Sequence, residues 1–107
     1  MANLVLDNSF PFYCYILLCS TGDYYCGITN NLERRLEEHN TKTSGWAAMR
    51  KPVMYVAFNG YQTRKEARKE EKRVKNFGVK QYYNRIRFDP STNWKYFIKK
   101  KPMIILT

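Results

Sequence analysis

A small set of side chains in this chain combines the types that could cleave a phosphodiester bond. Arginine binds phosphate bidentately, and a lone carboxylate with phosphate oxygens and water suits Mg²⁺. A tyrosine or histidine beside them could take a proton from water. The set comprises Tyr13, Tyr15, Tyr24, Tyr25, Arg35, His39 and Glu71. It indicates metal-assisted phosphodiester hydrolysis, although tyrosines in strands are usually packing residues with a polar tip.

Other kinds of catalytic site lack the residues they need. His39 is the single histidine, no nucleophile elbow is present, and the five glycines are scattered rather than clustered. Three cysteines without Cys-x-x-Cys spacing argue against a zinc site or a disulfide framework and favour a reducing, intracellular compartment. Cys14 and Cys26, which lie within apolar runs, are expected to be buried small hydrophobic residues.

Residues 12–40 supply the elements that would position most of these side chains. Two apolar, tyrosine-rich runs at 13–18 and 24–28 flank a polar break, which predicts two strands joined by a tight turn. Asn30 and Glu33 form a capping-box pattern that predicts a helix start there. Spacing of four then gives two opposite stripes on that helix. They are Asn31, Arg35 and His39 on one face, and Ile28, Leu32 and Leu36 on the other.

Residues 52–58 predict a third, central strand, and Asn59-Gly60 predicts a turn after it. Thr63 and Glu66 form a second capping-box pattern, for a helix from residue 64 to about 77. Gly78 would cap its end.

Glu71 falls on the packing stripe of this second helix. The stripe contains Ala67, Val74 and Phe77, with Glu70 closer to its edge. A carboxylate buried there costs several kcal/mol unless a cation or a metal compensates it. The alternative is a rim position bridged to Lys75 at spacing four, and the pattern favours neither.

Net charge is the strongest compositional signal. The 107 residues include 19 Lys and Arg against 9 Asp and Glu, a net charge of +10. This imbalance favours nucleic acid as a partner over an inert basic surface. An anionic membrane is a weaker rival, because no segment is both strongly amphipathic and rich in exposed apolar residues. The apolar run at 10–19 is too short to span a bilayer, and the N-terminus lacks the basic region of a signal peptide.

Two tripeptides and two helices give the chain a family resemblance. Tyr13-Cys14-Tyr15 and Tyr25-Cys26-Gly27, the run 27–36 ending in His39-Asn40, and the helix at 66–71 occur in order. Over residues 12–77 the chain resembles the GIY-YIG nuclease domain, and specifically its small single-domain members. Cys14 and Cys26 replace the usual aliphatic residue of each tripeptide. The resemblance implies an α+β fold with a small, mostly antiparallel three-stranded sheet flanked by helices.

The resemblance also implies a role for each matching residue. Tyr15 would help to deprotonate the attacking water, directly or through a neighbouring group, and Tyr25 would be its partner at the scissile phosphate. Arg35 would bind the phosphate and His39 would orient the nucleophile or relay a proton. Glu71 would hold one divalent metal ion, Mg²⁺ or Mn²⁺.

Further residues are expected to contact nucleic acid. Gly27 would let the backbone pass close behind the substrate. The loop before the third strand departs from the family pattern, since Gly45-Trp46-Ala47 stands where a lysine-aromatic-threonine sequence is usual. The expected contact residues are Tyr13, Gly27, Arg34, Lys42, Trp46, Arg50 and Lys75.

We expect one domain, with a lead-in at 1–11, a core at 12–78 and a C-terminal extension at 79–107 that packs on or beside the core. Residues 79–88 could be a short helix or an irregular basic arm. Trp94, Tyr96 and Phe97 beside three lysines could stack on bases, whereas residues 104–106 more readily close over the core.

The expected function is a divalent-metal-dependent DNA endonuclease, monomeric or homodimeric, that cuts one phosphodiester bond at a time. Single-stranded or branched DNA is favoured over plain duplex, because no duplex-reading module accompanies the core. Two alternatives remain. One is a non-catalytic nucleic-acid-binding protein with the same fold, and the other is an interaction subunit that uses the apolar C-terminus.

Overall fold

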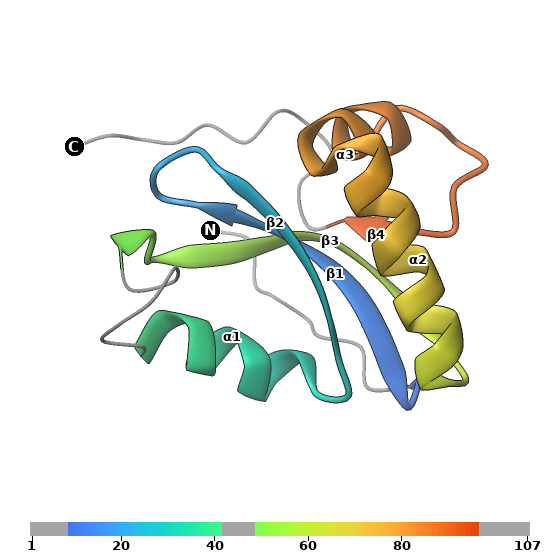
Figure 1. Ribbon diagram of the computed structural model, residues 1–107, viewed down its shortest axis with the longest axis horizontal. Helices are drawn as coiled ribbons and strands as arrows, with labels where there is room; N and C mark the ends of the chain where they lie inside the picture. Colours follow the sequence, from blue (N-terminus) through green and yellow to red (C-terminus); the bar gives the residue numbers. More distant parts are fainter. Residues whose placement is uncertain (1–8, 42–48, 97–107) are drawn as a thin grey trace.

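The computed structural model describes residues 9–41 and 49–96, which form an α+β fold (Figure 1). The elements in chain order are β1 (Phe12–Cys19), β2 (Tyr24–Thr29), α1 (Leu32–Thr41), β3 (Val53–Tyr61), α2 (Arg64–Phe77), α3 (Val79–Ile86) and β4 (Lys95–Tyr96). The expected small antiparallel sheet flanked by helices is confirmed, with β4 as a two-residue addition.

The sheet has the strand order β2-β1-β3-β4, and every described pair of neighbours is antiparallel. β1 is the central strand, and its residues from Tyr13 to Cys19 are buried on both faces. β2 is an edge strand. Because none of the described strands covers its outer side, a long side chain from one face can pass around β2 towards the other face.

Successive residues of β1 divide between two hydrophobic clusters, as the period of two in a strand requires. Cys14, Ile16 and Leu18 pack on the face covered by α2 and α3, together with Val74 and Tyr83. On the other face, which α1 covers, lie Tyr13, Tyr15, Leu17, Leu32 and Tyr55. Figure 1 shows α1 on one side of the sheet and α2 with α3 on the other. Tyr15 therefore points towards α1.

The first helix begins one residue later than the capping-box pattern predicts. The Asn31 side-chain oxygen accepts the Arg34 backbone N–H at 3.0 Å, which is the bond an N-cap makes. The Asn30 side chain instead accepts the Arg34 guanidinium at 2.6 Å, so the predicted pair of Asn30 and Glu33 is wrong. Ile28 also leaves the predicted helix stripe, because it belongs to β2 and packs on the α2 face.

The second helix matches its prediction. Thr63 and Glu66 form the capping box, with the Thr63 hydroxyl 3.2 Å from the Glu66 N–H and the Glu66 carboxylate 3.1 Å from the Thr63 N–H. Gly78 ends the helix with a φ of 103°, which favours glycine, and its N–H bonds to the carbonyls of Val74 and Lys75.

The predicted turn at Asn59-Gly60 is wrong. β3 continues through both residues to Tyr61, which pairs with Phe12. The strand tolerates Gly60 because the Phe10 ring occupies the space that a Cβ would fill. A glycine that looks like a turn signal is therefore a site of close packing.

Of the two alternatives for residues 79–88, the helix is observed, because α3 buries Tyr82, Tyr83 and Ile86 against the sheet. Trp94 is also buried in this cluster, so it does not stack on bases. Lys42, Trp46, Phe97 and residues 98–107 lie outside the described residues. In the part of the chain that is described, none of the helices is long and apolar enough to cross a membrane.

Candidate active site

The buried hydroxyl of Tyr15 is the centre of the site. It accepts a hydrogen bond from the Arg35 Nε at 3.2 Å and lies 3.1 Å from the His39 Nε2. Because arginine can only donate, the hydroxyl proton of Tyr15 is available to the His39 Nε2, which accepts it when the histidine is neutral. One tyrosine thus links both predicted polar residues of α1.

α1 is held against the sheet near both ends, which fixes the two side chains that meet Tyr15. At its start, the Tyr55 hydroxyl donates to the Leu32 carbonyl at 2.7 Å. At its end, the Asn40 side chain accepts the Val53 N–H at 2.7 Å and donates to the Val53 carbonyl at 3.2 Å. Sequence reasoning assigned no role to Tyr55 or Asn40, because these contacts join residues far apart in the chain.

Gly27 lies opposite Tyr15 in the β1–β2 pair and leaves room for its hydroxyl. A Cβ at Gly27 would lie 2.5 Å from the Tyr15 hydroxyl oxygen and 3.1 Å from the Tyr25 ring. We expected this glycine to let substrate approach, but Gly27 is itself buried. The reason the structure gives is internal: an added side chain would collide with Tyr15.

The surroundings keep Tyr15 neutral and Arg35 charged. Burial raises the pKa of Tyr15, and the hydrogen bond from Arg35 only partly opposes this. For Arg35, burial lowers the pKa, but the contact with Tyr15 and the bond to Glu38 outweigh burial, so the pKa rises. The guanidinium is part-exposed, with 29% of the side chain accessible, and it pairs with Glu38 at 3.2 Å.

Tyr25 extends the cluster towards the edge of the sheet. Its ring centroid is 6.4 Å from that of Tyr15 and 5.6 Å from that of His39. Tyr25 is partly exposed, whereas Tyr15 is fully buried and His39 is 3% exposed. Solvent can therefore reach Tyr25 and Arg35, but not the Tyr15 hydroxyl behind them.

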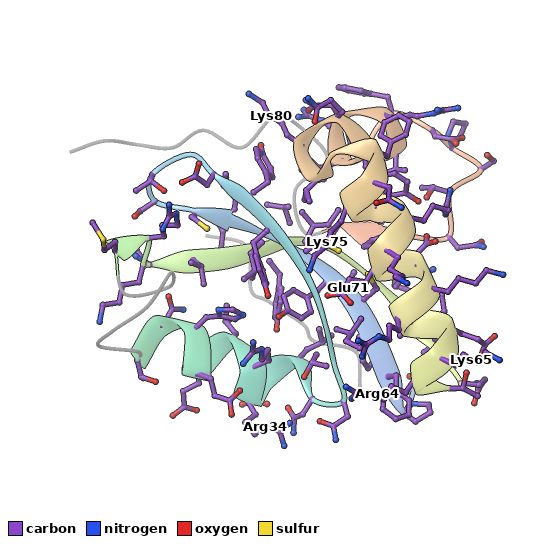
Figure 2. All side chains as sticks on the ribbon, viewed as in Figure 1. Arg34, Arg64, Lys65, Glu71, Lys75 and Lys80 are labelled. Carbon is purple, nitrogen blue, oxygen red and sulfur yellow. The ribbon has the colours of Figure 1, made fainter. Side chains whose placement is uncertain are left out.

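Glu71 joins this cluster from the opposite face of the sheet, through Lys75. The Lys75 Nζ lies 5.6 Å from the Tyr25 ring centroid and 3.1 Å from the Glu71 Oε2. Figure 2 shows Glu71 and Lys75 between α2 and β2. The Glu71 side chain is 19% exposed, so both readings hold in part: the carboxylate is near the packing stripe and it is bridged to Lys75.

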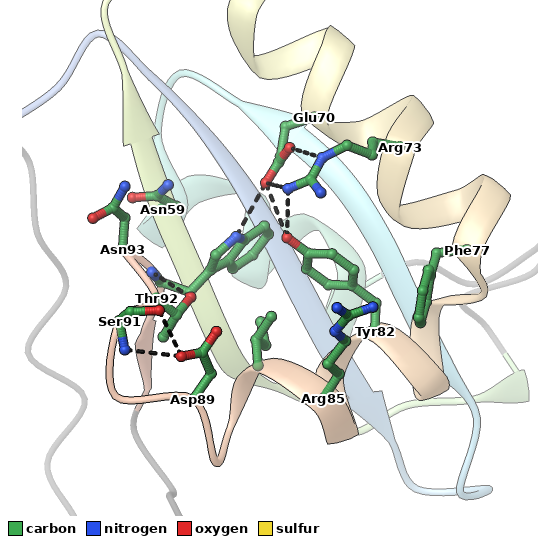
Figure 3. A pocket seen from close by; sticks show the side chains of 12 residues that line it. Asn59, Glu70, Arg73, Phe77, Tyr82, Arg85, Asp89, Ser91, Thr92 and Asn93 are labelled. Atoms are coloured by element: carbon green, nitrogen blue, oxygen red, sulfur yellow. Dashed lines mark hydrogen bonds and ion pairs between the residues drawn. The ribbon is translucent and has the colours of Figure 1, made fainter.

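The neighbouring carboxylate, Glu70, has a structural role (Figure 3). It accepts two bonds from Arg73, at 2.8 and 2.9 Å, and bonds at 3.2 Å from the Tyr82 hydroxyl and the Trp94 indole N–H. We expected Glu70 nearer the edge of the packing face, but at 14% exposure it is the more buried of the two. Phe77, predicted to lie on that stripe, is 47% exposed.

These Glu70 contacts form one wall of a cavity of about 340 Å³ between α2, α3 and residues 89–94. The carboxylate is already bonded by groups from three parts of the chain, and they attach the segment around Trp94 to α2. This accounts for the burial of Trp94, which sequence reasoning did not predict.

Two of the residues expected to contact nucleic acid serve the fold instead. Tyr13 is 1% exposed, and its hydroxyl accepts the Phe10 backbone N–H at 3.0 Å, so a contact with substrate is not supported. Gly27 is buried behind Tyr15. Arg34 and Lys75 are exposed, and Arg50, with 31% of its side chain accessible, pairs with Asp23 in the β1–β2 turn.

The described residues offer few protein ligands for a divalent ion. Among the described residues, no group of three or more His, Cys, Asp or Glu side chains could hold a metal. Glu71 is a single, part-exposed carboxylate. It fits an ion such as Mg²⁺, whose other ligands are water and phosphate oxygens, and it does not form an all-protein cage.

Comparison with known proteins defines the class to which this fold and site belong. Residues 11–84 match the GIY-YIG catalytic domain. The chain is 39% identical over 79 residues to a UPF0213 protein of Enterococcus faecalis, covering 71% of this chain and 90% of that protein. It is 39% identical over 67 residues to UPF0213 protein XAC3202 of Xanthomonas axonopodis pv. citri, covering 62% and 66% of the two chains.

A solution NMR structure, that of UPF0213 protein BH0048 from Bacillus halodurans, matches with 26% identity and a TM-score of 0.47 over 75% of this chain and 86% of that chain. The chain belongs to the GIY-YIG catalytic domain family, a nuclease-type family, as the ordered set of tripeptides and helices predicted.

Proposed function

We propose that this protein is a divalent-metal-dependent DNA endonuclease that hydrolyses one phosphodiester bond at a time. The observation that carries the proposal is the Tyr15 hydroxyl bonded to both Arg35 and His39, at 3.2 and 3.1 Å. This contact joins α1 to the central strand and holds a charged guanidinium at the surface beside Tyr25.

Arg35 is the group that would bind the scissile phosphate. Its charge and fork geometry suit a phosphate, and the bonds to Tyr15 and Glu38 restrict its orientation before substrate arrives. A donor fixed in this way can stabilise the negative charge that develops in the transition state.

Tyr15 acts through its neighbours. Its complete burial and raised pKa argue against direct removal of a proton from water. Its role is to position Arg35 and His39. Tyr25, which is partly exposed, would contact the attacking water or the phosphate.

Glu71 would hold the metal ion, Mg²⁺ or Mn²⁺. When bound, the ion would act as a Lewis acid on the phosphate and the leaving oxygen. Family membership supports a divalent metal, and the single carboxylate at the edge of β2 supports one ion rather than two.

The proposed substrate is single-stranded or branched DNA. The described residues provide one site, and their helices all pack on the two faces of the single sheet. None of the described helices or strands forms a separate duplex-reading module, so a strand that is already unpaired fits this site best.

One observation favours a second candidate, a DNA-binding protein without catalysis. The Lys75 ammonium bonds Glu71 at 3.1 Å, and an ion on that carboxylate must share it with Lys75 or displace it. If the ion cannot do so, the protein would bind DNA without cutting it.

The test uses purified full-length protein with end-labelled single-stranded, flap and duplex DNA of one sequence. Each is incubated with Mg²⁺, with Mn²⁺ and with chelator, alongside Arg35→Ala. The proposal expects cleavage that needs metal, favours the unpaired substrates and disappears in the variant. Salt-sensitive binding without product in any metal would support the second candidate.

A further inference from the structure

The two flanks of α2 differ in charge. Arg64, Arg68, Glu71 and Lys75 are spaced by four, three and four residues, which places them on one stripe of a helix. In Figure 2, Arg64, Glu71 and Lys75 lie on the side of α2 towards β2, whereas Lys65 extends to the opposite side. Arg64 and Arg68 are exposed. We call the three cations of this stripe, Arg64, Arg68 and Lys75, the basic flank.

The other flank of α2 contains more acidic residues. It comprises Lys65, Glu66, Lys69, Glu70 and Arg73, three bases against two acids, whereas the basic flank has three bases against Glu71 alone. Glu66 is bonded to Thr63 in the capping box, and Arg73 forms the paired bonds with Glu70. This flank therefore presents less net positive charge to a polyanion than the basic flank does.

We propose that the backbone of a DNA strand lies along the basic flank, with Arg64 and Arg68 binding phosphates on one side of Glu71. Lys75 lies on the other side, beside Tyr25, and Lys80, exposed at the start of α3, continues the line (Figure 2). Lysine and arginine side chains supply the phosphate contacts that position a protein on DNA without reading its sequence.

The length of the basic flank is matched to a short stretch of DNA. Eleven residues separate Arg64 from Lys75, which at 1.5 Å each is about 16 Å along the helix. A single strand laid over that distance has phosphates on both sides of Glu71. The strand would run past Glu71 instead of ending there, so the cut falls within it, as an endonuclease requires.

The position of the scissile phosphate rests on the proposed function. The path of the DNA strand along the basic flank concerns binding alone and can be measured without cleavage. Binding is measured in chelator, where a metal-dependent enzyme does not cut. A failure of cleavage and a failure of the path are therefore distinguishable.

The experiment compares two double variants of the full-length protein, Arg64→Gln/Arg68→Gln and Lys65→Gln/Lys69→Gln. Each removes two exposed cations at spacing four from α2, so the net charge changes equally. The replaced positions of the two variants are offset by one residue, which rotates them by about 100° around the helix. Binding of a labelled 20-nucleotide single strand is measured by fluorescence anisotropy from 50 to 200 mM salt, with circular dichroism as the check of folding.

If Arg64 and Arg68 each contact one phosphate, their loss lowers the salt slope by about 1.4, or 0.7 for each contact with a single strand. The affinity ratio of wild type to this variant then falls by roughly sevenfold between 50 and 200 mM salt. The Lys65/Lys69 variant should retain the wild-type slope. Equal effects of the two variants, no effect of either, or an absence of DNA binding by the wild type would overturn the path.

Discussion

Replacing Gly27 with alanine should damage the site by displacing the Tyr15 hydroxyl. The new Cβ would lie 2.5 Å from that oxygen, about 0.9 Å inside the 3.4 Å at which ordinary contact begins. Gly27 does not have a positive φ, so the effect is steric and involves no backbone strain. A hydroxyl displaced by that distance can no longer meet Arg35 and His39 in its present geometry, at 3.2 and 3.1 Å.

The expected cost of Gly27→Ala is about 3–5 kcal/mol in the free energy of unfolding. Overpacking a core costs about 1–3 kcal/mol, and each lost hydrogen bond adds about 1 kcal/mol. Guanidinium denaturation followed by circular dichroism measures it, provided that unfolding is two-state. Cleavage by the folded fraction should fall as well, because Arg35 loses its fixed position.

A double-mutant cycle with Tyr15→Phe identifies the clashing atom. Without the hydroxyl, alanine at residue 27 meets the ring carbon at 2.7 Å instead of the oxygen at 2.5 Å, and there are no bonds left to break. Gly27→Ala should therefore cost less in the Tyr15→Phe background, by at least about 0.5 kcal/mol. A Gly27→Ala protein within about 0.5 kcal/mol of wild type, or equal costs in both backgrounds, would refute this account of the glycine.

Three further predictions follow from the contacts of Tyr15, Glu70 and Thr63. Tyr15→Phe should slow cleavage without weakening DNA binding, because the hydroxyl is buried and acts through Arg35 and His39; a wild-type single-turnover rate would contradict this. Burial raises the pKa of Glu70, but the bonds from Arg73, Trp94 and Tyr82 outweigh it and hold the pKa below its usual 4.5. This stabilisation is present above pH 4.5 and is lost as the pH falls through the lowered pKa. Glu70→Gln should therefore flatten the loss of stability on acidification below pH 4.5, and an unchanged slope would count against this role of Glu70. Thr63→Ala should cost about 1 kcal/mol by removing the N-cap of α2, a change that thermal denaturation would detect.

Local patterns predicted much of this molecule because local interactions determine those parts. The capping box of Thr63 and Glu66 involves residues three apart, and the stripe of Arg35 and His39 follows from helical spacing alone. The burial of Cys14 and Cys26 followed from the apolar runs around them. Each of these needed no knowledge of distant segments.

The predictions from sequence that were wrong or missing involve contacts between segments far apart in the chain. Asn59-Gly60 has the composition of a turn, but pairing with β1 and packing of Phe10 keep it in a strand. Glu70 and Glu71 are adjacent in sequence, and only Tyr82 and Trp94, folded back onto α2, make Glu70 the structural one. Asn40 and Tyr55 were missed for the same reason, since each bonds a residue more than ten positions away.

In the proposed function Glu71 would serve catalysis, whereas the contacts of its neighbour Glu70 stabilise the fold. The most direct test is the single-turnover cleavage rate of Glu71→Gln and Glu70→Gln at saturating DNA and metal, below the temperature at which either variant unfolds. We predict that Glu71→Gln stays folded, binds DNA and loses cleavage, whereas Glu70→Gln is less stable but still cuts. Cleavage by Glu71→Gln at the wild-type rate would contradict the account.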